Sequence, residues 1–249
     1  TTLANLSTNF YIESGDTEKA IEVLDNSKSN TDDVDIKENN TIKIIGIKLQ
    51  KKDYKDMEKY LEEIADPEER AYYSAQYYAQ KKDPKLVKEY ETLLKSEKYK
   101  VYASKALGDY YFDKKDLAKS KKYYGTHVSI NKNPDEYDLY RLGQANEKEN
   151  NLKMALTDYK AVYSKNSKFA NDAMLRAAEI YDRQENNVEA EKLFTKLYAT
   201  KGNKDLKAYS IEKLIYYKLL NEKTKEAKKY YDELKKLDAK RAEKFKAYF

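Results

Sequence analysis

Small and aromatic positions recur along this chain at a fixed interval. Three stretches, which begin at Leu107, Leu142 and Ala177, align without gaps and lie 35 residues apart. Each contains a small residue, a second small residue 12 positions later and an aromatic residue four positions after that. The three sets are Gly108, Ser120 and Tyr124, then Gly143, Ala155 and Tyr159, then Ala178, Ala190 and Phe194. Such a period predicts stacked helix pairs, in which small residues let two backbones approach and the aromatic ring fills the space beside them.

A polar residue lies four positions before the second small residue of each unit. Seven such breaks occur, at spacings of 30 to 37 residues, at Asp16, Asp53, Asp83, Asp116, Asn151, Asn186 and Lys223. Aspartate and asparagine are preferred N-cap residues because their side-chain oxygens accept from the unpaired amides of a helix start. The pattern therefore predicts two helices of about three turns in each unit, joined by a short capped turn.

The composition excludes several classes of protein. The 249 residues include no cysteine, six glycines and three prolines. Disulfides, zinc–thiolate sites and thiol chemistry are therefore absent. Six glycines are too few for the turns of a many-stranded sandwich or for the phosphate loops of most nucleotide enzymes. The apolar stretches are much shorter than the roughly 20 residues of a membrane span. A mostly helical chain remains.

Charge is mixed along most of the sequence and unbalanced at its ends. There are 49 basic and 44 acidic residues, a net charge of +5, with −6 in residues 1–40 and +5 in residues 223–249. Evenly mixed charge is typical of solvated helix surfaces. The abundance of lysine, asparagine and tyrosine indicates an AT-rich genome and hence a bacterial source. Because the chain begins at Thr1 without a methionine, we expect a processed chain or a piece of a longer protein.

These positions resemble the tetratricopeptide repeat, whose signature places Leu-Gly-x-x-Tyr in the first helix and Ala-x-x-x-Phe in the second. Leu107, Gly108 and Tyr111, followed by Ser120 and Tyr124, match it best. The resemblance covers nearly the whole chain in seven units, about 1–34, 38–67, 68–100, 101–135, 136–170, 171–207 and 208–241. It implies one all-α domain, a right-handed α-solenoid of about seven helix-turn-helix units closed by a capping helix over 232–249.

Some units depart from the signature. None has its early tryptophan, and the closing proline survives only approximately, as Pro67 and Pro134. The third unit is several residues short and is expected to start its second helix with Pro84, which a first helical turn tolerates. The seventh unit has Leu214 and Ile215 in place of the small residue of its first helix.

The stretch from Tyr163 to Phe194 resembles one subgroup of the family more closely. It leads through Ser164, Lys165, Asn166 and Ser167 into Phe169-Ala170. Tetratricopeptide proteins of the Gram-negative envelope, such as the outer-membrane assembly lipoprotein and the Tol-Pal coordinator, often join repeats this way, usually with a proline that is missing here. The resemblance favours a periplasmic or cell-envelope location over a cytoplasmic one.

No catalytic motif is present, so we predict a chain that is not an enzyme and has no cofactor, metal or small-molecule substrate. His127, the only histidine, lies near the end of a second helix and is expected to be packed and neutral. Asp32, Asp33 and Asp35 are spaced like part of a calcium loop, but Ile36 replaces the closing glutamate. A solvated loop between helices is expected instead.

The tyrosines divide into two groups. Seven occupy the packing positions of the family and are expected in the core: Tyr11, Tyr78, Tyr111, Tyr124, Tyr159, Tyr181 and Tyr231. In the family, the first helix of each unit lines the inner, concave face, and the resemblance implies partner-binding side chains there. They are Asn5, Asn9, Tyr72, Gln76, Tyr102, Lys105, Asp109, Tyr137, Tyr140, Gln144, Glu147, Glu179 and Tyr216. Tyrosine offers a rigid contact with a polar hydroxyl, as recognition surfaces often do.

Some family members clamp a chain-terminal carboxylate with lysines and asparagines from successive units. Asn5 and Asn9 have suitable side chains, but Ile42 and Gly46 occupy the matching positions of the next unit. A chaperone C-terminus is therefore not the expected ligand.

We predict a scaffold that holds a peptide or protein segment along its concave face. The alternative is nucleic-acid or anionic-membrane binding through a basic C-terminal segment, which would weaken with salt. That segment contains Lys228, Lys229, Lys235, Lys236, Lys240, Arg241, Lys244 and Lys246. Self-association through the terminal repeats is a further expectation, because stacking arrays have open ends.

Overall fold

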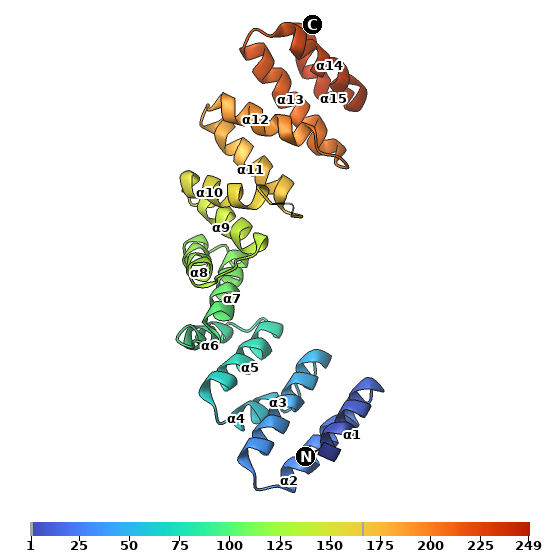
Figure 1. Ribbon diagram of the computed structural model, residues 1–249, viewed down its shortest axis with the longest axis vertical. Helices are drawn as coiled ribbons and strands as arrows, with labels where there is room; N and C mark the ends of the chain where they lie inside the picture. Colours follow the sequence, from blue (N-terminus) through green and yellow to red (C-terminus); the bar gives the residue numbers. More distant parts are fainter. Residues whose placement is uncertain (1, 166) are drawn as a thin grey trace. The chain divides into compact units, whose positions relative to one another are not determined.

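The computed structural model describes residues 2–165 and 167–249, with side chains described from Leu6 onward. Within these ranges all regular structure is helical and no strand occurs. The helices, in the order followed by the colours of Figure 1, are α1 (Thr2–Glu13), α2 (Thr17–Ser29), α3 (Val34–Lys51), α4 (Met57–Glu62), α5 (Pro67–Gln80), α6 (Leu86–Leu93), α7 (Lys100–Asp113), α8 (Leu117–Ile130), α9 (Glu136–Lys148), α10 (Leu152–Tyr163), α11 (Ala170–Arg183), α12 (Asn187–Tyr198), α13 (Lys204–Leu220), α14 (Thr224–Leu237), α15 (Ala239–Ala242) and the 3-10 helix η1 (Glu243–Tyr248).

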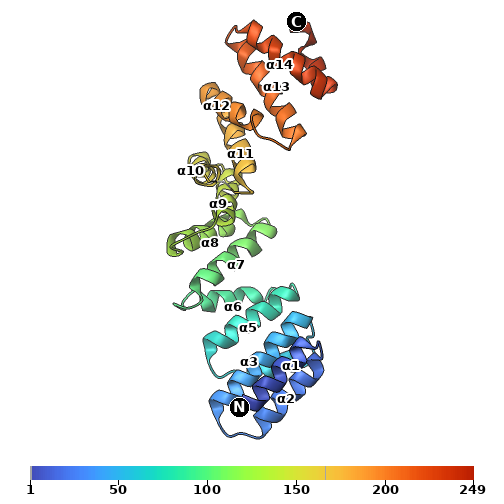
Figure 2. The same ribbon diagram turned by 45° about the vertical axis from the view of Figure 1, so that its right-hand side comes forward.

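The chain forms two compact units, one up to Leu107 and the other from Gly108 to Phe249. Within each unit, helices that follow one another in sequence lie side by side, as α1, α2 and α3 do in the first and α11, α12 and α13 in the second (Figures 1 and 2). This stacking of helix pairs is the α-solenoid that the repeat predicts. The assignment of seven repeats to a single domain stays a prediction.

The core of the aligned repeats is built from small residues facing aromatic rings. A Cβ atom on Gly108 would lie 2.9 Å from a ring carbon of Tyr124, and one on Gly143 would lie 2.8 Å from the ring of Tyr159. Ser120 Oγ also donates a hydrogen bond to the Gly108 carbonyl, at 3.0 Å. The aromatic rings are fully buried in all three aligned repeats, at Tyr124, Tyr159 and Phe194. The small residues are therefore required by the close approach of two helices.

The turn inside each repeat has the same backbone conformation. One residue with a positive φ stands directly before each of the seven polar breaks, namely Gly15, Lys52, Lys82, Lys115, Asn150, Glu185 and Glu222. At Glu185, for example, the amide bonds the Asp182 carbonyl at 3.0 Å, and the amide of Asn186 bonds the Tyr181 carbonyl at 2.9 Å. This is the Schellman ending of a helix, which gives partners to its last carbonyls.

The polar breaks cap helices in some repeats but not in all. Asp16, Asp116 and Asn186 accept from the amide three residues later, at the starts of α2, α8 and α12, as predicted. Asn151 stands at the N-cap of α10 but makes no side-chain capping hydrogen bond, and the same prediction is wrong for the second and third repeats. Asp53 and Asp83 bond the amides two residues on, at 3.0 and 2.9 Å, and cap a short turn instead.

These extra turns shorten the second helices of the two repeats. Helix α4 starts only at Met57 and has six residues, and α6 starts at Leu86 and has eight. Pro84 therefore lies in the turn before α6, whereas the sequence predicted it at the first helical position. The predicted length of about three turns is wrong for α4 and α6.

Four of the tyrosines predicted in the core, Tyr11, Tyr78, Tyr111 and Tyr181, are only half-buried and stand near the ends of first helices. A lysine ammonium from the following turn or helix lies over three of these rings. The distances from nitrogen to ring centroid are 5.7 Å for Lys19 on Tyr11, 5.4 Å for Lys85 on Tyr78 and 4.7 Å for Lys119 on Tyr111. The positions therefore combine ring packing with a cation–π contact at the edge of the core.

The C-terminal segment covers the last repeat with three short pieces. The expected capping helix over 232–249 consists of the end of α14, then α15, then η1. Leu234 is fully buried, and Leu237 and Phe245 pack against the same cluster. The ring of Phe249 lies 4.9 Å from that of Tyr231.

Candidate interaction surface

Two predicted contact residues of the first unit form an aromatic patch on α5 and α7. The rings of Tyr72 and Tyr102 meet edge to face with centroids 5.3 Å apart, and Tyr72 stacks on Tyr99 at 4.6 Å. Tyr102 keeps 41% of its surface exposed. Gln76 and Lys105 follow these tyrosines by about one helical turn and therefore share their faces. We name Tyr72, Tyr99, Tyr102, Gln76 and Lys105 the α5–α7 patch.

Asn9 lines a separate groove between α1 and α3. The groove has a volume of about 520 Å³ and is lined by Thr8, Asn9, Ile12, Lys43, Gly46, Ile47 and Gln50. Asn9 is exposed, and the side chain of Asn5 lies outside the described side chains. A Cβ atom added to Gly46 would have no atom of a neighbouring side chain or helix within 4 Å, so the floor of the groove is open at this residue.

In the second unit, Asp109 binds two tyrosines. It accepts hydrogen bonds from the hydroxyl of Tyr124 and, at 2.8 Å, from that of Tyr137. Arg141 Nε donates to the Tyr137 hydroxyl at 3.0 Å, and its Nη1 donates to Gln144 at 3.3 Å. Burial, with the hydrogen bond to Asp109, raises the pKa of Tyr124, so its phenol remains a donor at any physiological pH. Asp109 and Tyr137 thus hold neighbouring helices together.

A second network joins α9 to α11 around Glu147. Its carboxylate accepts from the Tyr159 hydroxyl at 2.8 Å, from Arg176 at 3.2 Å and from Arg183 at 2.8 Å. Arg176 also donates to the Tyr140 hydroxyl at 3.2 Å. Burial and the bond to Glu147 raise the pKa of Tyr159 above its usual range. Tyr140 was predicted to contact a partner, and its hydroxyl already accepts this hydrogen bond from Arg176.

Phe169 packs beside the predicted tyrosines of α9. Its ring stacks on Tyr140 with centroids 5.3 Å apart and lies 5.8 Å from Tyr137. The three rings make an aromatic surface whose members are all half-buried. From the sequence, Phe169 was predicted only as a linker residue, although its place just before α11 gave a signal for this contact.

The remaining predicted contacts are scattered. Glu179 on α11 accepts from the Tyr209 hydroxyl at 3.4 Å, and Gln144 is 9% exposed. Gln144 is buried and accepts a hydrogen bond from Arg141, so it offers little surface to a partner, and its role as a contact residue stays a prediction. Tyr216 on α13 is 49% exposed, and its ring meets that of Tyr217 edge to face with centroids 5.5 Å apart.

His127 belongs to a buried polar pair that the sequence did not reveal. Its Nε2 lies 2.9 Å from an oxygen of Asp138, and each side chain is 2% exposed. Asp138 also completes a capping box with Asp135 at the start of α9. The pair therefore fixes α8 against α9, and among the described residues no group of side chains has the composition of a metal site.

The basic C-terminal segment is partly neutralised by its own carboxylates. Lys244 and Arg241 contact Glu212 at 2.7 and 3.8 Å, and Lys246 contacts Glu243 at 2.8 Å. Lys228 pairs with Asp232 one turn further along α14. Half of the eight basic side chains predicted for anion binding are thus engaged in ion pairs, which weakens the case for that function. No described helix is both long enough and apolar enough to cross a membrane.

The structure thus brings together Tyr72 with Tyr102, and Asp109 with Tyr137. Tyr140 joins Tyr137 through Phe169. No recorded contact joins these groups to Asn9, Glu179 or Tyr216 among the described residues. The α5–α7 patch and Tyr216 offer more open aromatic surface than Tyr137 and Tyr140, whose hydroxyls hold neighbouring helices.

No family model matches this chain, and no curated protein matches it in sequence. Solved structures match its fold. The C-terminal part of a TPR repeat-containing protein from Cytophaga hutchinsonii has a TM-score of 0.67 at 18% identity and covers 94% of this chain and 96% of its own. A tetratricopeptide repeat protein from Parabacteroides merdae has a TM-score of 0.56 at 12% identity, covering 95% and 93%. Pseudomonas aeruginosa pilF has a TM-score of 0.50 at 17% identity, covering 86% and 98%.

These similarities confirm the predicted fold as an all-helical solenoid of the tetratricopeptide type. They also support the resemblance to the tetratricopeptide family. At such identities they show the fold alone, because function resides in particular side chains placed on it.

Proposed function

We propose that this chain is a non-enzymatic scaffold that binds an extended segment of a partner protein along the face formed by its first helices. Tetratricopeptide folds generally serve as protein-interaction modules, and two structural neighbours are described as tetratricopeptide repeat proteins, which supports that class. The observation that carries the proposal is the α5–α7 patch. It combines the exposed ring of Tyr102 and the half-buried ring of Tyr72 with the neighbouring amide of Gln76, which suits a peptide backbone with apolar side chains.

The patch is suited to recognition because its rings are held in place. Tyr72 contacts Tyr73, Tyr99 and Tyr102, with centroid distances between 4.6 and 5.3 Å. The hydroxyl of Tyr99 donates to Glu69 at 2.6 Å. Rings fixed by such contacts lose little conformational entropy when a partner binds, which favours affinity.

Removal of the two central rings tests this proposal. Tyr72→Ala with Tyr102→Ala should weaken capture of the partner from a source-organism extract at least about thirtyfold, since one interface tyrosine contributes about 2 kcal/mol. A photo-crosslinking amino acid in place of Gln76 should attach the partner covalently, and mass spectrometry then identifies the segment bound.

Two controls accompany the experiment. Tyr248→Ala removes an equally large exposed ring, 63% exposed, far from the patch in sequence. The crosslinker in place of Met154, which is 55% exposed on the second helix α10, samples another face. Unchanged capture by the double variant, or equal crosslinking at positions 76 and 154, would refute the proposed surface.

We also propose a cell-envelope location, on the resemblance of the stretch from Tyr163 to Phe194. The structure adds that Phe169, in this stretch, stacks on Tyr140, so the linker packs against α9. Capture from membranes and from cytosol separately distinguishes the locations. Specific partners found only in cytosol would count against the envelope.

A further inference from the structure

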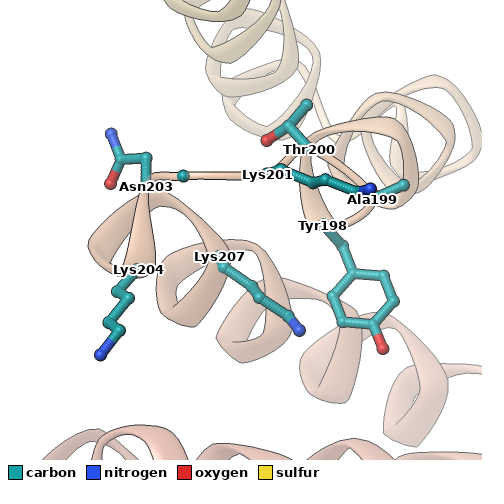
Figure 3. Close-up of a pocket in the computed structure, with 8 residues that line it drawn as sticks. Tyr198, Ala199, Thr200, Lys201, Asn203, Lys204 and Lys207 are labelled. Atoms are coloured by element: carbon teal, nitrogen blue, oxygen red, sulfur yellow. The ribbon is translucent and has the colours of Figure 1, made fainter.

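A basic pocket opens at the loop between α12 and α13. It has a volume of about 470 Å³ and is lined by Tyr198, Ala199, Thr200, Lys201, Gly202, Asn203, Lys204 and Lys207 (Figure 3). Tyr198 comes from the end of α12, and Lys204 and Lys207 come from the first turns of α13 (Figure 3). Gly202 has a φ of 93°, which turns the loop sharply between the two helices.

Two of the three lysines carry uncompensated charge. Lys207 pairs with Glu233 at 2.8 Å and lies over the Tyr198 ring at 5.1 Å. Lys201 and Lys204, in contrast, are exposed and form no ion pair with any side chain that the structure describes. Asp205 is the one acidic residue within 198–207, so this stretch keeps a net charge of +2.

The end of the connection between α2 and α3 and the first turn of α3, which together we call the Asp32–Asp35 loop, have the opposite character. Asp32, Asp33 and Asp35 are exposed, and only Asp33 has a structural task there, as the N-cap that accepts from the Ile36 amide at 3.1 Å. Asp32 and Asp35 have no ion-pair partner within the described part of the chain. Between them Val34 projects with 65% of its surface exposed, beside the three carboxylates.

The N-terminal and C-terminal parts of the chain differ in net charge in the same sense as the two loops. Residues 1–40 carry a net charge of −6, and residues 198–249 carry +7, more than the +5 of the entire protein. The two loops are also equivalent in the repeat, since each connects the second helix of one pair to the first helix of the next. Complementary charge of this size steers association and selects the register of a contact.

We propose that two copies of this chain associate through these loops, with the Asp32–Asp35 loop of one copy seated in the Lys201–Lys204 pocket of the other. Asp32 and Asp35 would pair with Lys201 and Lys204. The exposed Val34 would enter the pocket against Tyr198 and the lysine stems, where its apolar surface leaves water. Because the contact joins two different surfaces, it is heterologous and needs no side chain of the α5–α7 patch.

Charge reversal on each side tests the contact. We expect the full chain to self-associate in sedimentation equilibrium at about 0.1 M salt and to dissociate at about 1 M salt, where the screening length falls from about 10 Å to about 3 Å. Lys201→Glu with Lys204→Glu, and separately Asp32→Lys with Asp35→Lys, should each weaken self-association about tenfold or more, since like charges then meet. A mixture of the two charge-reversed proteins should associate again.

The matched control is Lys153→Glu with Lys160→Glu on α10, which changes the net charge equally at exposed positions and should leave association unchanged. Circular dichroism checks that each variant keeps its helicity. A monomer at low salt overturns the proposal. So does an association that neither reversal weakens, or a mixture of the two reversed proteins that fails to associate.

Discussion

At the scale of single residues, some glycines pack against an aromatic ring of the paired helix and others face open space. Gly143 faces the buried ring of Tyr159, whereas Gly125, inside α8, has no atom within 4 Å of the place where its Cβ would stand. The same substitution is therefore expected to act in opposite directions at the two positions.

Gly143→Ala should lower the free energy of unfolding by about 1–3 kcal/mol, because the new methyl group forces Tyr159 or the α9 backbone to move. Gly125→Ala should raise it by about 0.5–1 kcal/mol, because alanine loses less backbone entropy in a helix. Urea unfolding followed by circular dichroism measures both. Changes of equal sign would contradict the packing described for Gly143.

A buried carboxyl gives the protein a pH dependence of its own. Asp158 is 8% exposed and accepts one hydrogen bond, from Asn146 at 2.8 Å. Burial raises its pKa to about 6 from an ordinary 3.8. The folded state therefore binds this proton more tightly than the unfolded state does. The stability that this tighter proton binding contributes is fully present below about pH 4 and is lost as the pH rises through 6.

Asp158→Asn should consequently stabilise the protein at pH 8 by about 1–3 kcal/mol, as a shift of two pKa units implies. The difference from wild type should shrink between pH 7 and pH 4, because wild-type Asp158 becomes neutral in the folded state there. Urea midpoints measured across this range provide the test. A difference that is constant with pH would show that Asp158 titrates normally.

Single residues also show what the sequence could and could not predict. Tyr124 and Tyr159 were predicted in the core and are fully buried, since their place is fixed by the small residue opposite. Tyr11 and Tyr111 occupy equally regular positions, yet they end first helices where a lysine can reach the ring. The repeat pattern fixes the position of a side chain along its helix, but it does not fix how deeply that side chain is buried.

At the scale of elements, the ends of the helices are determined mainly by the backbone. The seven positive-φ positions recur although only one of them, Gly15, is a glycine. A lysine, asparagine or glutamate in this conformation costs about 1 kcal/mol or more relative to glycine. The closing hydrogen bonds of each turn and the packing of the paired helices maintain it.

Glu185→Gly should therefore stabilise the protein by about 1 kcal/mol, since Glu185 is exposed and has a φ of 58°. Glu185→Val should destabilise it, because a β-branched side chain crowds the backbone in the left-handed region. Thermal unfolding of the two variants gives the comparison. If valine were tolerated as well as glycine, the turn would have to adopt another conformation in solution.

Helix lengths were predicted less well than helix existence. The first helices that carry the small-residue and aromatic pattern, such as α7, α9 and α11, stand where the repeat places them, because that pattern extends over several turns. Asp53 and Asp83 look like N-caps in sequence, yet each precedes a turn that the repeat does not require. The repeat period could not show this, because a turn of a few residues changes where a helix begins without moving its buried side chains.

At the scale of the whole molecule, the solenoid could be predicted because each repeat contacts mainly its sequence neighbours. Which of the predicted contact residues remain open to a partner could not be predicted in the same way. Tyr137 and Tyr140 have the position and chemistry of partner-binding residues, but their hydroxyls bind Asp109 and Arg176, 28 and 36 residues away. Which side chains remain available depends on the rotation of each helix against the next, and a repeat pattern in a single sequence does not contain that angle.

The carboxylates between neighbouring helix pairs of the second unit have a consequence for inheritance. Asp109 binds the phenol of Tyr137, Glu147 the guanidinium of Arg176, and Asp182 the ammonium of Lys213 at 2.5 Å. Each junction thus has its own chemistry. A recombination event that duplicated or exchanged one repeat would leave a half-buried carboxylate without its partner from the next repeat. Such an exchange should cost stability at each mismatched junction, so the divergence of the repeats in sequence favours inheritance of their order as a whole.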